Sequence, residues 1–373
     1  MLCAVDMDVE IYIRQYLWRN KMVKLLESDY YKVKPLIKSK NEISVFSAID
    51  GDIPGEFFVN NLENPTAVLI KTCECNLVAG IADDMFISNL KSELDFWDEV
   101  TPDSQDWFEK IPLLHKNKFI RPFKRRRYVL NEDSFIKREI PLPDGFVLEK
   151  VDLDDLRNSS YKNSESILEW VESWGDDTAF IEKGAGNYIR NNESIVSWSI
   201  SDCSYADQIT IGVQTDEKHR KQGFGIKVVS ETVNDCFKKG YKTINWLCVD
   251  SNKGSIILGE KLGFVHNNDY FFFCSYLPTE NPSDISVEEW FAWAKYLEET
   301  QEPQLIEESV YSYMKANNVA KVIEMIKSLP QFGIEPDFDE YTDTIYYYQL
   351  FGLSSNFNEP AWLEFIDLHK RIK

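Results

Sequence analysis

Apolar residues follow strand-like spacing along most of the first 280 residues. Short β-branched or aromatic runs are separated by Gly, Pro, Asn or Asp clusters, which is the pattern of strands joined by turns. In the first part of the chain the predicted strands are 43–49, 56–59, 66–72 and 76–79. In the middle part they are 146–151, 187–190, 194–201, 209–215, 243–249 and 271–276.

Helical spacing appears between these strands and dominates after Pro278. Helices are predicted over 11–26, 166–174, 226–239 and from 252 towards Leu262. Gly240 ends the third of these as a C-cap. Ser286 and Glu289 form a capping box ahead of the tail helices. The tail helices are predicted over 290–299, 303–315, 319–329, 339–351 and 360–372.

This order of elements predicts an α/β protein in three parts. At 373 residues the chain exceeds a single small domain. Pro141, Pro143 and Asp144-Gly145 mark a boundary after the first strands. We therefore expect an N-terminal α+β domain over 1–135, a mixed-sheet domain over 136–277 and an all-helical domain over 278–373.

The charge narrows the choice of partners. A formal net charge of −21 disfavours nucleic acid and anionic membranes, because phosphates would be repelled, and suits either a cationic substrate or solubility alone. No apolar run is long enough to span a bilayer and the start lacks a signal peptide, so we expect a cytoplasmic protein. The sequence does not define the oligomeric state.

The seven cysteines are scattered, as reduced cytosolic thiols would be. Cys73-Glu74-Cys75 is too tightly spaced for a zinc knuckle and lacks a second pair. No metal site is predicted. A basic run over 116–127 suits a phosphate or, as the favoured interpretation, the solvated edge of a sheet.

The most informative stretch joins the predicted strand 209–215 to the helix 226–239. A glycine turn that opens a helix presents unpaired backbone N–H groups to an anion. Gly223 and Gly225 let a phosphate approach the backbone closely. The spacing fits neither dinucleotide nor nucleoside-triphosphate loops.

The set Arg220-x-x-Gly223-x-Gly225, Asn252-x-x-Ser255 and Leu262-Gly263-Phe264 resembles the Gcn5-related N-acetyltransferase (GNAT) family. The resemblance implies a GNAT-type mixed sheet, a degenerate GNAT-like front domain and acetyl-coenzyme A as co-substrate. It places the pyrophosphate on the turn and the pantetheine arm on Asn252 and Ser255. Gly212 interrupts a predicted strand, which indicates a bulge or a close backbone approach. The resemblance implies a bulge there that separates two strands, with backbone groups of Val213 and Thr215 presented to the acetyl carbonyl and pantetheine. The implied coenzyme-binding residues are Val213, Thr215, Arg220, Lys221, Gln222, Gly223, Phe224, Gly225, Asn252 and Ser255.

A narrower resemblance is to acetyltransferases of the zwittermicin A resistance type. It rests on Trp246-Leu247-Cys248, the strand-rich front and the Glu288-Glu289-Trp290 segment of the tail. It implies acetylation of a primary amine on a small cationic natural product, an aminopolyol or peptide antibiotic, and hence resistance. Acylation of a protein or peptide amine, and a non-catalytic acyl-coenzyme A sensor, stay open as alternatives.

The catalytic residues are less well defined. Gly259 stands where many relatives carry a tyrosine that protonates the departing thiolate, so Ser255, Tyr270 or water would have to replace it. Asp207, just before the strand 209–215, is the first candidate for the general base, and Glu217 is the second.

The acceptor site is predicted at the helix 166–174 and the loop after it. Carboxylates beside indole rings suit an ammonium group, although an amphipathic helix with core tryptophans would show the same pattern. The candidate acceptor-binding residues are Trp170, Trp174, Asp176 and Asp177, with Glu169 and Glu172 beside them.

Overall fold

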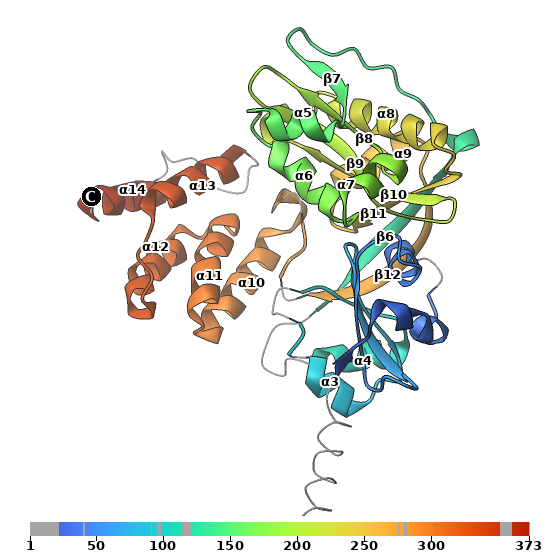
Figure 1. Cartoon of the computed structure of the whole chain (residues 1–373). Helices are drawn as coiled ribbons and strands as arrows, with labels where there is room; N and C mark the ends of the chain where they lie inside the picture. Colours follow the sequence, from blue (N-terminus) through green and yellow to red (C-terminus); the bar gives the residue numbers. More distant parts are fainter. Residues whose placement is uncertain are drawn as a thin grey trace, which may run out of the picture. The chain divides into compact units, whose positions relative to one another are not determined.

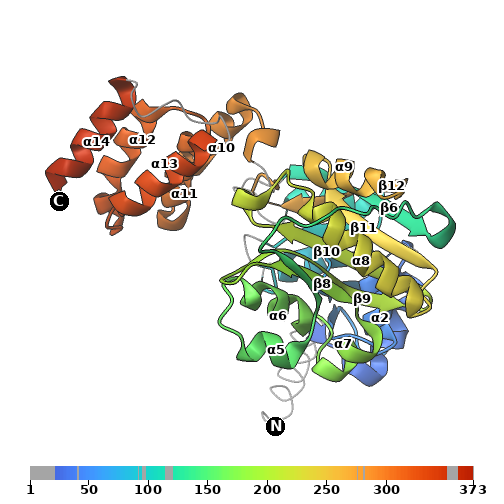
Figure 2. The same ribbon diagram turned by 90° about the horizontal axis from the view of Figure 1, so that it is seen from above.

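The computed structural model describes residues 22–39, 42–90, 92–94, 98–113, 121–274, 276–279, 282–350 and 360–372 (Figures 1 and 2). The chain divides into two compact units. One holds the described residues up to 250 together with 254–274, and the other holds 251–253 and the described residues from 276 onward. Most of the predicted helix 11–26 lies outside the described residues, and its end contains β1 instead.

One mixed sheet runs through the first unit. Its twelve described strands lie in the order β1-β2-β3-β4-β5-β12-β6-β11-β10-β9-β8-β7. Their bounds are β1 Val23–Lys24, β2 Glu56–Val59, β3 Ala67–Lys71, β4 Asn76–Gly80, β5 Val100–Pro102, β6 Arg121–Asn131, β7 Val147–Lys150, β8 Gly186–Arg190, β9 Ile195–Tyr205, β10 Gln208–Thr215, β11 Thr243–Val249 and β12 Val265–Cys274. The predicted boundary at 135/136 falls inside this unit, between β6 and β7.

Helices pack on both faces of the sheet. In the first unit they are α2 Ile43–Ile49, α3 Asp84–Leu90, α4 Gln105–Lys110, α5 Leu153–Asn158, α6 Ser164–Glu172, α7 Asp177–Lys183 and α8 Phe224–Lys238, followed by α9 Lys253–Lys261. Trp170 of α6 meets Trp198 of β9, whereas Asn187 of β8 donates to Thr232 of α8. Asn187 pairs with Ser199, the neighbour of Trp198, so α6 and α8 cover opposite faces.

The segment 43–49 is helical, so the predicted strand there is wrong. All seven of its residues are buried, because α2 packs against β9 and β10. A short apolar run that is buried all round carries no periodicity, and therefore cannot distinguish a strand from a buried helix.

The basic run is also placed differently from the prediction. Its described part forms β6, which lies between β11 and β12 and is antiparallel to both, so it is a central strand and not an edge. Its cations are matched by acids: Arg125 pairs with Glu99 at 2.6 Å, and Arg126 pairs with Asp250. Ion pairing within the sheet therefore accounts for much of this charge.

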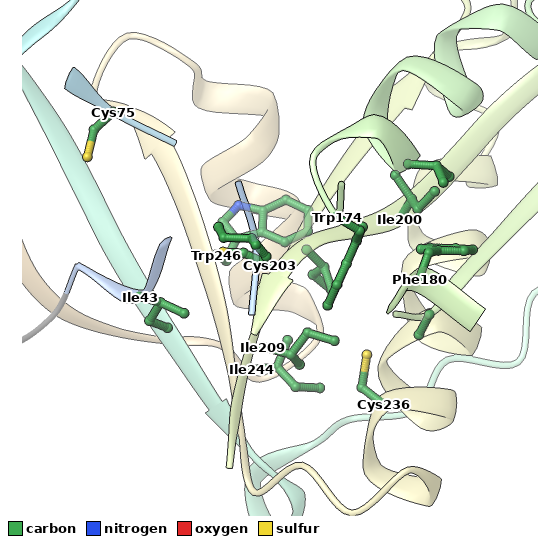
Figure 3. Close-up of a cluster of buried hydrophobic side chains, with 14 of the residues drawn as sticks. Ile43, Cys75, Trp174, Phe180, Ile200, Cys203, Ile209, Cys236, Ile244 and Trp246 are labelled. Carbon is green, nitrogen blue, oxygen red and sulfur yellow. The ribbon is translucent and has the colours of Figure 1, made fainter. Parts of the chain in front are cut away.

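A single hydrophobic core extends from Leu25 to Phe264 and contains side chains from both sides of the predicted boundary. Figure 3 shows part of it, with Ile43 from the front part and Trp174, Ile209 and Trp246 from the middle part. The front and middle parts therefore share one core as well as one sheet.

The second unit is helical, as predicted. Its helices are α10 Val287–Thr300, α11 Pro303–Lys315, α12 Val319–Ser328, α13 Phe338–Leu350 and α14 Pro360–Ile372, and it has a hydrophobic core of its own. The capping box is present, since Ser286 Oγ accepts from the Glu289 N–H at 3.2 Å and Glu289 accepts from the Ser286 N–H at 3.1 Å. Among the described residues, no helix is long and apolar enough to cross a bilayer.

A buried ion pair joins the start of α2 to the central strand β6. Arg127 donates to both carboxylate oxygens of Glu42 at 3.3 Å, and both residues are under 5% exposed. Burial raises the pKa of Glu42, and the charge of Arg127 opposes that rise. Each charge is tolerated in the interior because the other is present.

We predict that Arg127→Met destabilises the protein by about 3–5 kcal/mol, because Glu42 is left as an uncompensated buried charge. Denaturant unfolding of the full chain measures the loss. Arg157→Met is the matched control, because it breaks the solvent-exposed pair with Asp177 and should have a far smaller effect. Equal losses of unfolding free energy in the two variants would show that the buried Arg127–Glu42 pair is not the cause.

Candidate active site

The turn before α8 has the backbone of an anion-binding loop. Gly223 is the N-cap of α8 with φ of 88°, and Lys221 has φ of 62°. A left-handed lysine is strained by about 1–3 kcal/mol, and such strain gathers at ligand clamps. Arg220 and Gln222 brace the turn, donating to the carbonyls of Thr215 and Lys218, both at 3.2 Å. The first N–H groups of α8 are left for a ligand.

The second glycine of the turn has a packing role. A Cβ at Gly225 would lie 2.9 Å from Leu258 of α9 and 3.3 Å from Thr215 Oγ1. Thr215 Oγ1 is itself held by the Ser197 hydroxyl at 2.8 Å. Gly225 therefore lets the start of α8 lie close to the end of β10, which aims the turn at that strand.

Strands β10 and β11 part in the middle of the sheet. Residues 208–210 of β10 pair in parallel with residues 243–245 of β11. Beyond these residues β10 continues along β9, and β11 continues along β6. From Ile211 onward, no strand among the described residues pairs with the edge of β10 that faces β11. Val213 and Thr215 lie on this free stretch and lead directly into the glycine turn.

Gly212 marks a close approach and not the predicted bulge. Gly212 of β10 pairs with Ile200 of β9, in a register that is unbroken from Ile211 to Thr215. The irregularity in this pairing lies earlier, between Thr210 and Ile211. A Cβ at Gly212 would lie 2.3 Å from the Trp170 ring. The absence of a side chain at 212 therefore lets the indole of α6 lie against the backbone of β10.

The start of α9 faces β11. Trp246 Nε1 donates to Ser255 Oγ at 2.9 Å, and a Cβ at Gly259 would lie 3.7 Å from the same nitrogen. The indole thus fills the space beside Gly259. Asn252 precedes α9 in the short segment 251–253, which clusters with the helical unit.

The parting strands, the glycine turn and the crossover helix α8 all lie within the segment that a family model matches. The GNAT acetyltransferase family model matches residues 34–273, which is well over half of the chain. The chain belongs to the GNAT acetyltransferase family. It is therefore an acyltransferase, and its family generally uses acetyl-coenzyme A.

Individual relatives are distant. "Uncharacterized N-acetyltransferase YdfB" of Bacillus subtilis is 24% identical over 271 residues, which cover 68% of this chain and 98% of that protein. The crystal structure of a GCN5-related N-acetyltransferase-like protein from Streptococcus suis is 20% identical, with a TM-score of 0.54, and covers 67% of this chain and 99% of that one. The latter likeness confirms the fold.

Asp207 lies at the opposite end of β10 from the glycine turn. It lies exposed in the β9–β10 turn, with its carboxylate 3.1 Å from Lys242 Nζ. The glycine turn follows the other end of β10, a strand of eight residues, which corresponds to a separation of roughly 25 Å. Glu217 lies in the 3₁₀ turn just before Arg220, whose guanidinium is 3.9 Å away.

The predicted acceptor residues have different roles. Trp170 is half-buried against Gly212, whereas Trp174 is a core residue whose indole donates to the Ser201 carbonyl at 2.9 Å. Asp176 caps α7 by accepting from the Ala179 N–H, and Asp177 forms a two-point pair with Arg157 that lowers its pKa. Trp170 lies against Gly212 of β10. Trp174 is a core residue and the two aspartates have local partners, so Trp170 is the residue on which we base the acceptor proposal.

Tyr270 stands on β12, which is separated from β11 by β6. Burial raises the pKa of its phenol, and its ring lies 5.4 Å from the Arg127 guanidinium. Ser255, which contacts β11 through Trp246, is therefore the better placed of the two candidate acids.

We predict that Gly212→Ala destabilises the protein by about 1–3 kcal/mol, because its methyl group would overlap the Trp170 ring. Thermal and denaturant unfolding measure the loss. Adding Trp170→Ala should recover most of it, since the overlapping atoms are then gone. A double variant that is as unstable as the sum of the two single variants would show that the contact is not the cause.

We predict that Gly223→Val weakens coenzyme A binding at least about tenfold, by straining the turn and blocking the approach of a phosphate. Gly240→Val is the matched control: Gly240 follows the other end of α8 with φ of 96° and has open space around it. Calorimetry should show weakened binding for the first variant alone. Equal affinity in both variants would remove the turn from the coenzyme site.

Proposed function

We propose that this chain transfers the acetyl group of acetyl-coenzyme A to a primary amine of a small cationic natural product. An aminopolyol or peptide antibiotic of the zwittermicin A kind is the acceptor class, and resistance is the outcome for the cell. The observation that carries the acetyl-transfer part is the free stretch of β10 that runs into the glycine turn. A thioester aligned along that strand would meet unpaired backbone N–H groups that polarise its carbonyl.

Trp170 is the residue that we propose to bind the acceptor. Its ring lies against Gly212, one residue before Val213, and therefore beside the stretch assigned to the thioester. An indole face attracts an ammonium group by a cation–π interaction. The exposed Glu169 and Glu172 on the same helix, and the net charge of −21, add an attraction for cations.

The reaction needs few groups from the protein. The amine arrives as ammonium, loses one proton and attacks the thioester carbonyl. The tetrahedral intermediate then loses a second proton from its nitrogen as the coenzyme A thiolate leaves, and the thiolate takes up a proton. In this proposal Glu217 or water accepts the ammonium proton, Ser255 protonates the thiolate, and water carries the intermediate's nitrogen proton back to Ser255. Asp207 is not part of this scheme.

Two other functions compete with this proposal. A protein or peptide N-acyltransferase would use the same coenzyme site with a larger acceptor. A non-catalytic acyl-coenzyme A sensor would bind the coenzyme and release no thiol. This alternative rests on Gly259, which replaces the tyrosine that protonates the thiolate in many relatives. We favour the enzyme, because the family model matches the whole of the described β10 turn region.

The test incubates the full chain and acetyl-coenzyme A with aminopolyol, aminoglycoside, peptide and neutral amines. Free thiol and product mass are measured. We expect acetylation of polycationic small amines, with a KM that rises with salt because screening weakens attraction of the cation. The KM for the anionic coenzyme should stay level or fall.

Trp170→Leu should raise the KM for the cationic amine more than the KM for acetyl-coenzyme A, and Trp174→Phe, in the core, is its control. Acetylated peptides alone would favour the protein acyltransferase. Coenzyme binding with no thiol release across the panel would favour the sensor. Equal turnover of neutral and cationic amines at low salt would overturn the preference for cations.

A further inference from the structure

Two cysteines and an aspartate from distant parts of the sequence meet at one point of the first unit. Cys73 lies in the turn between β3 and β4, and Asp202 and Cys203 lie on β9. The two sulfurs and a carboxylate oxygen of Asp202 are all within 4.8 Å of one another. Both cysteines are free thiols, and the Cys73 thiol donates to the Asp202 carbonyl at 3.9 Å.

An irregularity in β9 makes this group possible. Thr210 pairs with Cys203 and Ile211 pairs with Ser201, so Asp202 is an extra residue in β9, a β-bulge. In a regular strand Asp202 and Cys203 would point to opposite faces. The bulge turns both side chains towards Cys73, and bulges of this kind re-aim side chains at functional sites.

In and beside this group are buried carboxylate oxygens that have no hydrogen-bond partner among the described residues. Asp202 Oδ1 has no hydrogen-bond partner, and the same holds for Oε1 of Glu74, which follows Cys73. Glu74 is held in place through its other oxygen, which accepts from the Ser44 N–H at 3.2 Å. Among the described residues, neither carboxylate pairs with a lysine or arginine. A buried carboxylate without a countercharge is costly, and a cation would remove that cost.

We propose that Cys73, Asp202 and Cys203 bind a zinc ion. Two thiolates and a carboxylate are ligands that zinc accepts, whereas calcium and magnesium require oxygen throughout. In a tetrahedral zinc site two sulfurs lie about 3.8 Å apart, so ligand atoms within 4.8 Å need only small side-chain rotations. The Glu74 carboxylate or a water molecule completes the fourth position.

The proposed ion links the front part of the unit to the middle part. Cys73 belongs to the β3–β4 turn, and the Asp202 carbonyl also accepts from the Ser173 hydroxyl at 2.7 Å, just after α6. Zinc would thus fix the position of the β9 bulge beneath the end of α6, the helix that carries Trp170. Cys73 is exposed and gives the ion a route in from solvent, while Cys203 is fully buried.

The test uses the full chain, reduced and stripped of metal, and titrates it with Zn²⁺ against a competing chelator and with Co²⁺ as a spectroscopic probe. We expect one equivalent bound, a thiolate-to-cobalt charge-transfer band and a higher melting temperature with zinc. Cys73→Ser should abolish all three, and because Cys73 is exposed this variant should still fold. Asp202→Asn should weaken binding at least about tenfold, as expected for the loss of a charged ligand.

Cys75→Ala is the matched control, because Cys75 lies two residues away in the same turn and outside the group. It should bind zinc like the unaltered chain. Binding far below one equivalent would overturn the proposal, as would full binding by Cys73→Ser. A Cys73–Cys203 disulfide in thiol titration and mass spectrometry of the untreated protein would also overturn it, and would identify a redox pair instead. None of these readouts depends on acetyl transfer.

Discussion

The parting of β10 from β11 is the constraint on which the rest of the first unit depends. A sheet gains stability by pairing, so two strands that stop pairing at Thr210 and Asn245 need other partners. β11 stays paired with β6 along its whole length, and β10 stays paired with β9 to Thr215. Each strand is therefore held in place by its other neighbour, while the facing edges of β10 and β11 beyond Thr210 and Asn245 stay outside the β10–β11 ladder.

The front part of the chain is an integral part of the first unit, because it supplies elements that hold β9, β10 and β11. It supplies β6, which lies between β11 and β12, and α2, which packs against β9 and β10. A central strand rich in arginine is unusual, and it is possible here because acids and rings receive the cations. Arg127 meets Glu42, and the Arg125 guanidinium lies 4.3 Å from the Phe272 ring. The same acids make β6 a poor site for a phosphate.

Local patterns in the sequence predicted the class of the fold, most strands and the tail helices, where α11 and α14 have the predicted bounds. The glycine turn was predictable because its chemistry lies in consecutive residues. Features that depend on residues distant in sequence were not predictable from such local patterns. The insertion of β6, the helix at 43–49 and the meeting of Cys73 with Cys203 all follow from packing. The core position of Trp174 was not predictable either, because composition does not show which side of a helix a residue occupies.

Gly259, which stands where many relatives carry a tyrosine, packs beside Trp246. A tyrosine at 259 would project from α9 into space that the indole of β11 already borders, at 3.7 Å from a Cβ. The indole N–H donates to the Ser255 hydroxyl oxygen at 2.9 Å, which holds that side chain against β11. In the proposed mechanism Ser255, one turn before Gly259 on the same helix, takes the place of the usual tyrosine. The proposed acid therefore depends on how α9 packs on β11.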